Sequence, residues 1–214
     1  NILFVMGWDR FVFYPRHDGW KDGVGYEGAL VDSRPVVNNE HPQTTEDIAS
    51  LYPSGDQLIN ACSTTLITDK ADLEIADSEG IEYITATGKD LMAPGDVAMH
   101  PDFAAKTFHL VQHTIGDEGR QPKGLVPEVM KLLVHTRRDV KAYMKTVTDP
   151  QELELLDLWQ LVLKLLANGG YGALAFKGFK LPMIAIAAFI TWIGRVTVTK
   201  MQEGANAMSC PQYL

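Results

Sequence analysis

Residues 126–168 have the sequence VPEVMKLLVHTRRDVKAYMKTVTDPQELELLDLWQLVLKLLAN, and this stretch decides the fold. Apolar residues recur every three to four positions over 126–145 and again over 152–168, which is the period of an amphipathic helix. Thr148-Asp149-Pro150 separates the two segments, and Gly169-Gly170 is a predicted stop after the second. The short connection predicts that the two helices pack side by side as an antiparallel hairpin.

Polar side chains follow a helical spacing on this hairpin. Arg137 and Lys141 are one turn apart on the first helix, Lys164 and Asn168 are one turn apart on the second, and Tyr171 lies just beyond. Folding the hairpin could bring the three cations and the amide onto one wall, where they would suit a triphosphate. The alternative is that basic residues simply decorate exposed helix surfaces, and spacing alone favours this alternative.

A second informative stretch is DIASLYPS, residues 47–54. We expect Asp47 to end a short strand and the chain to turn into a helix that begins at Pro53. Backbone N–H groups at such a turn favour anions, Asp47 beside them could bind Mg²⁺, and Tyr52 would stand over the same site. The alternative is an ordinary strand–turn–helix in which the aspartate caps the helix.

The rest of the chain contains weaker signals. YEGALV (26–31) and TEDIAS (45–50) are predicted short strands, and residues 67–122 alternate acidic loops with weak strands such as IEYITAT (81–87). A third helix is predicted from Pro182 to about Gln202. Its apolar run, LPMIAIAAFITWI (181–193), is too short to span a bilayer, so it predicts a buried helix and no membrane partner.

The charge is distributed unevenly over the 214 residues. The net charge of −8 by itself argues against nucleic-acid binding. Residues 1–119, however, contain 7 Lys and Arg against 20 Asp and Glu, whereas residues 120–200 contain 12 against 6. A basic module is therefore attached to an acidic one, unless both are ordinary solvated surfaces.

Cysteine and histidine usage is not that of a metal-bound or disulfide-linked domain. Cys62 and Cys210 are far apart in the sequence, which makes a reducing intracellular compartment the default. His109 and His113 are one helical turn apart with His100 nearby, but no third ligand has persuasive spacing. We therefore expect hydrogen-bonded or exposed histidines rather than a zinc site.

Several of these stretches, in this order, resemble the family B DNA polymerases. YEGALV resembles the element that precedes the palm, DIASLYPS resembles motif A, and GLVPEVMKLLVHTRRDVKAYMK (124–145) resembles the first helix of the fingers. KLLANGGYG (164–172) resembles motif B, and the Thr191-to-Arg195 pattern after it also fits. The form of the first element is more similar to the enzymes of large DNA viruses than to cellular ones.

The resemblance implies an α+β fold, with a palm built on a mixed sheet and a helical hairpin as the fingers. Residues 1–25 stay unassigned, 26–122 would be palm with motif A, 123–172 fingers with motif B, and 173–214 a return to the palm. The implied activity is template-directed transfer of nucleotides from dNTPs to a DNA 3′ end. The implied partners are primer–template DNA, dNTPs, Mg²⁺ and the remainder of a longer polymerase chain, at intracellular sites of DNA replication in the nucleus or the cytoplasm.

Roles for single residues also follow from the resemblance. Asp47 would bind the catalytic Mg²⁺ ions, and Lys164 would stabilise charge in the transition state. Tyr52 would be the steric gate that excludes a ribose 2′-hydroxyl. The triphosphate would be bound by Ser50, Leu51, Arg137, Lys141, Lys164 and Asn168, with Tyr171 against the base pair, and DNA would be contacted by Tyr26, Gly28 and Gly172.

The chain departs from the family pattern at several positions. Gly55 and Asp56 stand where two aliphatic residues are usual, Gly169 replaces a serine, and no counterpart of motif C follows motif B. One carboxylate holds two Mg²⁺ ions poorly, so we expect this chain alone to be inactive or nearly so. The competing hypothesis is a noncatalytic helical-hairpin module derived from, or resembling, a polymerase.

Overall fold

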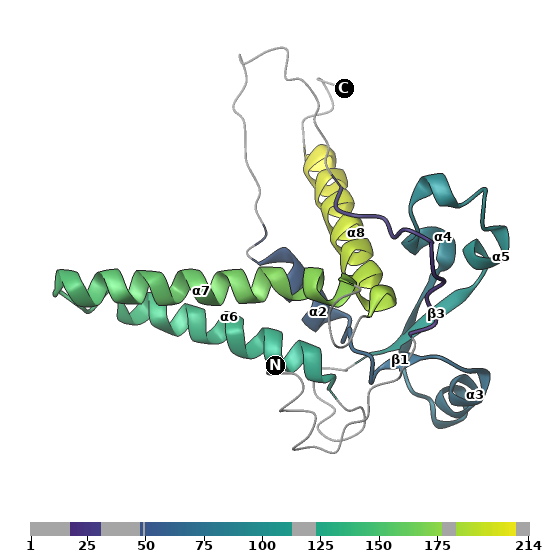
Figure 1. Ribbon diagram of the computed structural model, residues 1–214, viewed down its shortest axis with the longest axis horizontal. Helices are drawn as coiled ribbons and strands as arrows, with labels where there is room; N and C mark the ends of the chain where they lie inside the picture. Colours follow the sequence, from purple (N-terminus) through teal and green to yellow (C-terminus); the bar gives the residue numbers. More distant parts are fainter. Residues whose placement is uncertain (1–17, 31–47, 49, 113–122, 177–182, 209–214) are drawn as a thin grey trace, which may run out of the picture.

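The computed structural model describes residues 18–30, 48, 50–112, 123–176 and 183–208, and for 205–208 it describes the backbone alone. A rod of two long helices projects from a mixed α/β body (Figure 1). The described elements, in chain order, are α2 Leu51–Leu58, β1 Leu66–Ile67, α3 Lys70–Glu79, β2 Tyr83–Thr87, α4 Gly88–Leu91, the 3-10 helix η1 Pro94–Asp96, α5 Pro101–Ala104, β3 Thr107–Val111, α6 Leu125–Tyr143, α7 Pro150–Ala175 and α8 Ile184–Met208.

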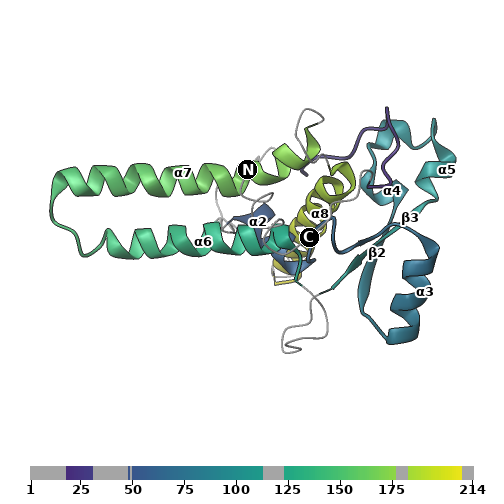
Figure 2. The ribbon, with the colours of Figure 1, turned by 60° about the horizontal axis from the view of Figure 1, so that its bottom comes forward.

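The rod is the hairpin of α6 and α7. Pro150 occupies the first turn of α7, and the Asp149 carboxylate caps the helix by accepting the N–H of Gln151 at 3.2 Å. Figure 2 shows the two helices side by side and running in opposite directions. The predicted antiparallel hairpin is therefore confirmed, and its helical periodicity and short connection are the reason that it could be predicted.

The predicted end of the second helix is wrong. Gly169 and Gly170 do not stop α7, which continues to Ala175. Tertiary packing outweighs the intrinsic cost of two glycines in a helix, about 1 kcal/mol each. Leu174 is 1% exposed, and a Cβ on Gly170 would lie 2.3 Å from Cε of Met130. The absence of a side chain at Gly170 thus lets α6 approach α7 closely.

Helix α2 begins two residues before the predicted start at Pro53. Ser50, its N-cap residue, has a positive φ of 56°, and its side chain does not cap the helix. The helix lies against α8, where small residues allow a close approach. A Cβ on Gly55 would lie 3.0 Å from Cγ2 of Ile193, and one on Gly194 would lie 3.2 Å from Cε1 of Tyr52.

The described strands form one antiparallel sheet in the order β1-β3-β2, instead of the expected mixed sheet. Tyr83 pairs with Val111 and Thr87 with Thr107, so the strand predicted within 81–87 is confirmed. Of the predicted 26–31 strand, the structure has a single bridge between Tyr26 and Met92. The predicted 45–50 strand lies mostly outside the described residues, and α3, α4, α5 and β3 were not predicted individually.

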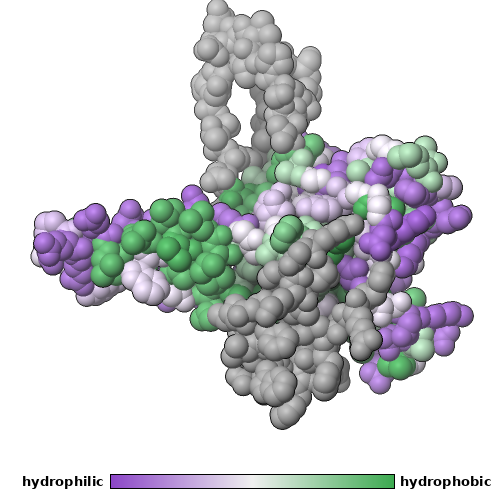
Figure 3. Space-filling view, viewed as in Figure 1, coloured by the Kyte–Doolittle hydropathy of each residue, from purple (hydrophilic) through white to green (hydrophobic). Residues whose placement is uncertain are grey.

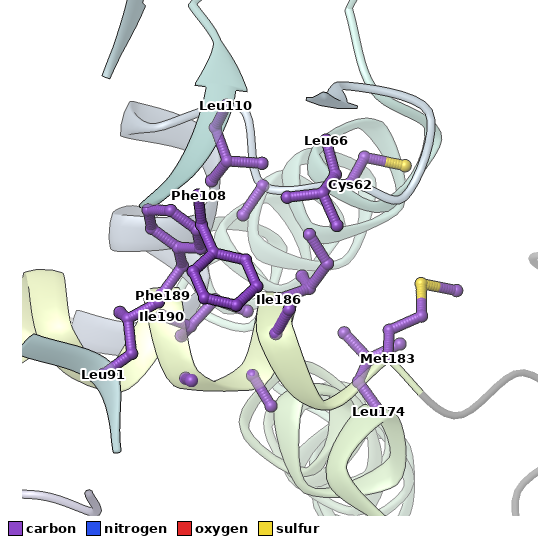
Figure 4. Packing of buried hydrophobic residues seen from close by; sticks show 14 of the residues in the cluster. Cys62, Leu66, Leu91, Phe108, Leu110, Leu174, Met183, Ile186, Phe189 and Ile190 are labelled. Carbon is purple, nitrogen blue, oxygen red and sulfur yellow. The ribbon is translucent and has the colours of Figure 1, made fainter. Parts of the chain in front are cut away.

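The core lies where the sheet meets the first half of α8. Figure 4 shows Phe108 and Leu110 of β3 beside Ile186, Phe189 and Ile190 of α8, and all five side chains are at most 3% exposed. Among the described helices, α8 is long and apolar enough to cross a membrane by length and composition. The apolar segment is thus longer than the 181–193 run that the sequence analysis judged too short to span a bilayer. Most side chains of residues 183–191 are buried, as predicted for the described part of that run.

Two buried carboxylates in the body have different surroundings. Asp18 accepts the N–H of Ala185 at 2.8 Å at the start of α8 and that of Trp20 at 3.1 Å. Asp56 of α2 is 2% exposed, and neither of its carboxylate oxygens has a hydrogen-bond partner among the described residues. It lines a small cavity of about 10 Å³ with mostly apolar neighbours. Burial raises the pKa of Asp56 well above its usual value.

Asp56 should therefore make stability depend on pH. Its unfolded-state pKa is about 3.9, so its contribution is fully present below that pH and is lost as the pH rises through the higher folded-state pKa. Replacing Asp56 with leucine should raise the free energy of unfolding by about 1–3 kcal/mol at neutral pH. The gain should shrink toward pH 4, which urea unfolding of parent and variant across pH 4–8 measures.

Two asparagine substitutions serve as controls for Asp56→Leu. Asp56→Asn should lose the pH-dependent component while keeping a polar side chain of the same shape, and Asp102→Asn, at an exposed position, should leave the parent's pH profile unchanged. A stability difference between Asp56→Leu and the parent that is constant across the pH range would show that folding does not shift the pKa of this carboxyl.

Candidate active site

One face of α7 carries the predicted polar residues. Arg137 of α6 donates from Nε to Oε1 of Gln160 on α7 at 3.2 Å. Lys164 and Asn168 follow Gln160 at successive intervals of four residues, so all three lie on the same side of the helix. Lys164, Asn168 and, on α6, Lys141 are exposed. Arg137 therefore reaches the same α7 face that presents Lys164 and Asn168.

This face ends at a cluster of tyrosines at the base of the rod. Tyr171, three residues after Asn168, continues the face, and its ring centroid lies 4.4 Å from that of Tyr52 on α2. Burial raises the pKa of Tyr26 and of Tyr52, and the nearby Tyr171 raises both further. Three tyrosines that are far apart in the sequence are thus gathered beside the basic face.

Arg195 attaches the segment around Tyr26 to α8. Its guanidinium donates to the carbonyls of Glu27 (2.7 Å), Gly28 (2.9 Å) and Asp90 (2.7 Å), and it lies 3.1 Å from the Glu27 carboxylate. One turn earlier, Thr191 donates its hydroxyl to the Glu27 carbonyl at 2.7 Å. Burial lowers the pKa of Arg195, against the opposing effect of Glu27.

Arg195 was not among the predicted site residues. The spacing of Thr191 and Arg195 was visible in the sequence, but it assigned no role to either residue. Their shared acceptor, the carbonyl of Glu27, is more than 160 residues away in the chain. Only the folded structure could therefore reveal that they position the segment that carries Tyr26 and Gly28.

The other predicted site residues lie at the turn before α2, at exposed glycines or outside the described part of the chain. Asp47 lies outside the described residues, so the proposed metal ligand has no described geometry. Ser50 takes the left-handed conformation immediately before α2, and Leu51 is half-buried. Gly28 and Gly172 are exposed, and a Cβ on either would meet no atom of the described residues within 4 Å.

The described histidines have ordinary hydrogen-bonding environments. Nδ1 of His109 lies 2.9 Å from the Thr85 hydroxyl, and Nδ1 of His100 lies 3.3 Å from Nζ of Lys21. His113 is outside the described residues. Over the described ranges, no three His, Cys, Asp or Glu side chains come together as a metal site.

Comparisons with known proteins agree with the predicted family. The family model described as DNA polymerase family B matches residues 2–213. The DNA polymerase delta catalytic subunit of Arabidopsis thaliana is 32% identical over 188 residues, covering 88% of this chain and 15% of the relative. That of Schizosaccharomyces pombe is 30% identical over 178 residues, covering 83% of this chain and 14% of the relative.

A viral relative is similarly distant. The DNA polymerase catalytic subunit of Psittacid herpesvirus 1 is 27% identical over 199 residues, covering 91% of this chain and 16% of the relative. The predicted likeness to viral enzymes is therefore not distinguished from likeness to cellular ones. The chain spans about one sixth of these relatives or less. Because the family model matches almost every residue, the chain belongs to DNA polymerase family B.

Proposed function

We propose that this chain is the part of a family B DNA polymerase that binds the incoming dNTP and supplies one carboxylate ligand for the catalytic metal ions. The reaction would be template-directed transfer of a nucleotide to a DNA 3′ end. The observation that supports it best is the continuous α7 face from Gln160 through Lys164 and Asn168 to Tyr171, where Tyr171 meets Tyr52. Lys164, with Arg137 reaching over from α6, thus leads to a pair of tyrosine rings, which suits a nucleotide's phosphates and its sugar and base.

In this proposal the phosphates lie along the rod. Arg137 offers a planar, bidentate donor, Lys141 and Lys164 are point charges, and Asn168 donates without charge. The bond between Arg137 and Gln160 holds the guanidinium toward α7 before nucleotide binds. Lys164 would also stabilise the negative charge that develops during phosphoryl transfer.

The turn before α2 would bind the end of the triphosphate. Ser50 in the left-handed conformation, followed by the helical Leu51 and Tyr52, is the kind of backbone arrangement that directs successive N–H groups toward an anion. Tyr52 would pack against the sugar, supported from behind by Gly194 and from the side by Tyr171. A ring held on two sides is stiff enough to exclude a 2′-hydroxyl.

Mg²⁺ would be held by Asp47, by triphosphate oxygens and by carboxylates from elsewhere in a longer polymerase, since the described residues contain no carboxylate cluster of their own. Such ions stabilise the attacking and leaving oxygens in a two-metal transfer. This division of ligands agrees with the expectation that the chain is inactive, or nearly so, when alone.

Within a longer polymerase, residues 26–122 would be palm, 123–172 fingers and 173–214 a return to the palm. Primer–template DNA would be contacted near Tyr26, Gly28 and Gly172. Arg195 would act as a positioning residue, because its hydrogen bonds to the Glu27 and Gly28 carbonyls fix the backbone beside Tyr26. The protein would work at sites of DNA replication.

The first test removes the proposed metal ligand. In the complete polymerase that contains this segment, Asp47→Asn should abolish Mg²⁺-dependent primer extension while primer–template affinity stays within about twofold, because phosphate contacts to DNA do not need this carboxylate. Asp102→Asn is the matched control at an exposed aspartate and should extend primers normally. Normal extension by Asp47→Asn would refute the assignment.

The second test concerns sugar selection. Tyr52→Ala should raise the kcat/KM for ribonucleotides relative to deoxyribonucleotides by at least about tenfold, since an apolar pocket can reject an added hydroxyl by about a hundredfold. Tyr52→Phe keeps the ring and should keep the selectivity, which single-nucleotide insertion kinetics would measure. Unchanged selectivity in the alanine variant would show that another group excludes the 2′-hydroxyl.

The third test concerns the basic face. Lys164→Ala should raise the KM for dNTP and lower kcat, together by about 10²–10³ in kcat/KM, because the cation serves both binding and the transition state. Lys131, exposed on α6 and outside the proposed site, provides the control substitution Lys131→Ala. Equal small effects of both substitutions would place the triphosphate elsewhere.

A further inference from the structure

A buried asparagine joins three separate parts of the chain at the base of the rod. Asn60, just after α2, is 1% exposed. Its Oδ1 accepts the N–H of Gly124, the N-cap residue of α6, at 2.8 Å. Its Nδ2 donates to the carbonyl of Val111, the last residue of β3, at 3.1 Å. These partners are 64 and 51 residues further along the chain, so one side chain ties the start of α6 to both α2 and the sheet.

The turn that follows Asn60 holds this asparagine in one conformation. Its φ is 51°, in the left-handed region that asparagine adopts more readily than most residues. The hydroxyl of Thr65 donates to the Asn60 carbonyl at 2.5 Å and accepts the N–H of Cys62 at 3.1 Å. The Thr65 carbonyl accepts the N–H of Val111 at 2.9 Å. The Asn60 amide is therefore presented in a single orientation, toward Gly124 and Val111.

The backbone of α6 begins in close contact with this turn. A Cβ on Gly124 would lie 2.5 Å from Cβ of Cys62 and 3.2 Å from Oδ1 of Asn60. The next two residues, Leu125 and Val126, are at most 3% exposed. Apolar packing has no preferred direction, whereas hydrogen bonds do. The two bonds of the Asn60 amide therefore set how the start of α6 is turned and tilted.

The orientation of the rod depends on its base. Among the described residues, the outer part of the rod stands clear of the body (Figure 2 and Figure 3). At about 1.5 Å per residue, Arg137 lies about 20 Å from Gly124 along α6, so a tilt of about 5° at the base displaces it by about 2 Å. A misplacement of about 1 Å in a site can cost about a hundredfold in rate. The distance between Arg137 and Tyr52 on α2 thus depends on what holds the start of α6.

We propose that Asn60 is a positioning residue for nucleotide binding, whose side-chain amide holds α6 at the angle to α2 in which the cations of the rod and Tyr52 face the same nucleotide. This inference rests on the proposed function, which places the triphosphate and sugar between these elements. Without the amide, the rod would take several orientations, and one of them would bind dNTP. The apparent affinity would fall by the fraction of molecules in that orientation, while the chemistry after binding would change little.

Hydrogen exchange of the 214-residue chain tests whether Asn60 holds α6. Asn60→Gly removes the amide and keeps the left-handed backbone, and Gly124→Ala introduces the Cβ that has no space. Each should speed exchange in the first turns of α6 by at least about tenfold and leave α3 unchanged, because the opening is local. Gly124→Ala decides the question if Asn60→Gly does not fold. Parent-like exchange of α6 in the folded variants would overturn the proposal.

Ser63→Ala is the matched control. It removes a hydroxyl that is buried in the same turn and has no hydrogen-bond partner in the part of the chain that the structure describes. Its α6 should exchange like that of the parent. Equally fast exchange in Ser63→Ala and Asn60→Gly would show that any change in this turn releases α6, which would overturn a specific role for the Asn60 amide.

Single-nucleotide insertion by the complete polymerase tests the consequence for binding. Asn60→Gly should raise the KM for dNTP about tenfold while kcat stays within about twofold, and Ser63→Ala should match the parent. Loss of folded protein alone would instead lower kcat at an unchanged KM. An unchanged KM in Asn60→Gly would overturn the role in nucleotide binding. Exchange in the 214-residue chain does not depend on the proposed function, so it still decides the hold on α6 if Lys164→Ala leaves dNTP kinetics normal and overturns the proposed site.

Discussion

The packing of the last turns of α7 against α2, α6 and α8 is the constraint on which the rest of the structure depends. Leu174 is fully buried, Gly170 lets Met130 approach, and Tyr171 lies on Tyr52. These contacts join the rod to the body and fix its rotation about its own axis. The face with Lys164 and Asn168 consequently ends at the tyrosines rather than in open solvent.

A buried cation on α8, Arg195, holds a second part of the body in place. Arg195 is charged and mostly covered, a state that costs free energy unless its donors are satisfied. Three backbone carbonyls and the Glu27 carboxylate satisfy them, and two of those carbonyls belong to Glu27 and Gly28. A guanidinium with five fixed donors can hold an otherwise irregular segment in one position beside α8. Asp56 shows the contrast, since no donor in the described part of the chain satisfies its carboxylate.

The two sides of α7 differ in chemistry and therefore in what they can do. One side offers the Lys164 ammonium, the Asn168 amide and the Tyr171 phenol in a row, which suits a polar ligand. The other offers leucines and a tryptophan, which gain free energy only when another apolar surface covers them.

The sequence by itself determined the hairpin, β2, a buried third helix and membership of the family, because these depend on local periodicity and on short patterns in a fixed order. It also placed Lys164 and Asn168 one turn apart, since helix geometry alone decides that. Only the tertiary structure decided that α7 continues through Gly169 and Gly170, that Tyr26, Tyr52 and Tyr171 meet, and that Asp56 has no partner. These outcomes depend on contacts between residues far apart in the chain, whose burial outweighs local preference and leaves no trace in any short stretch.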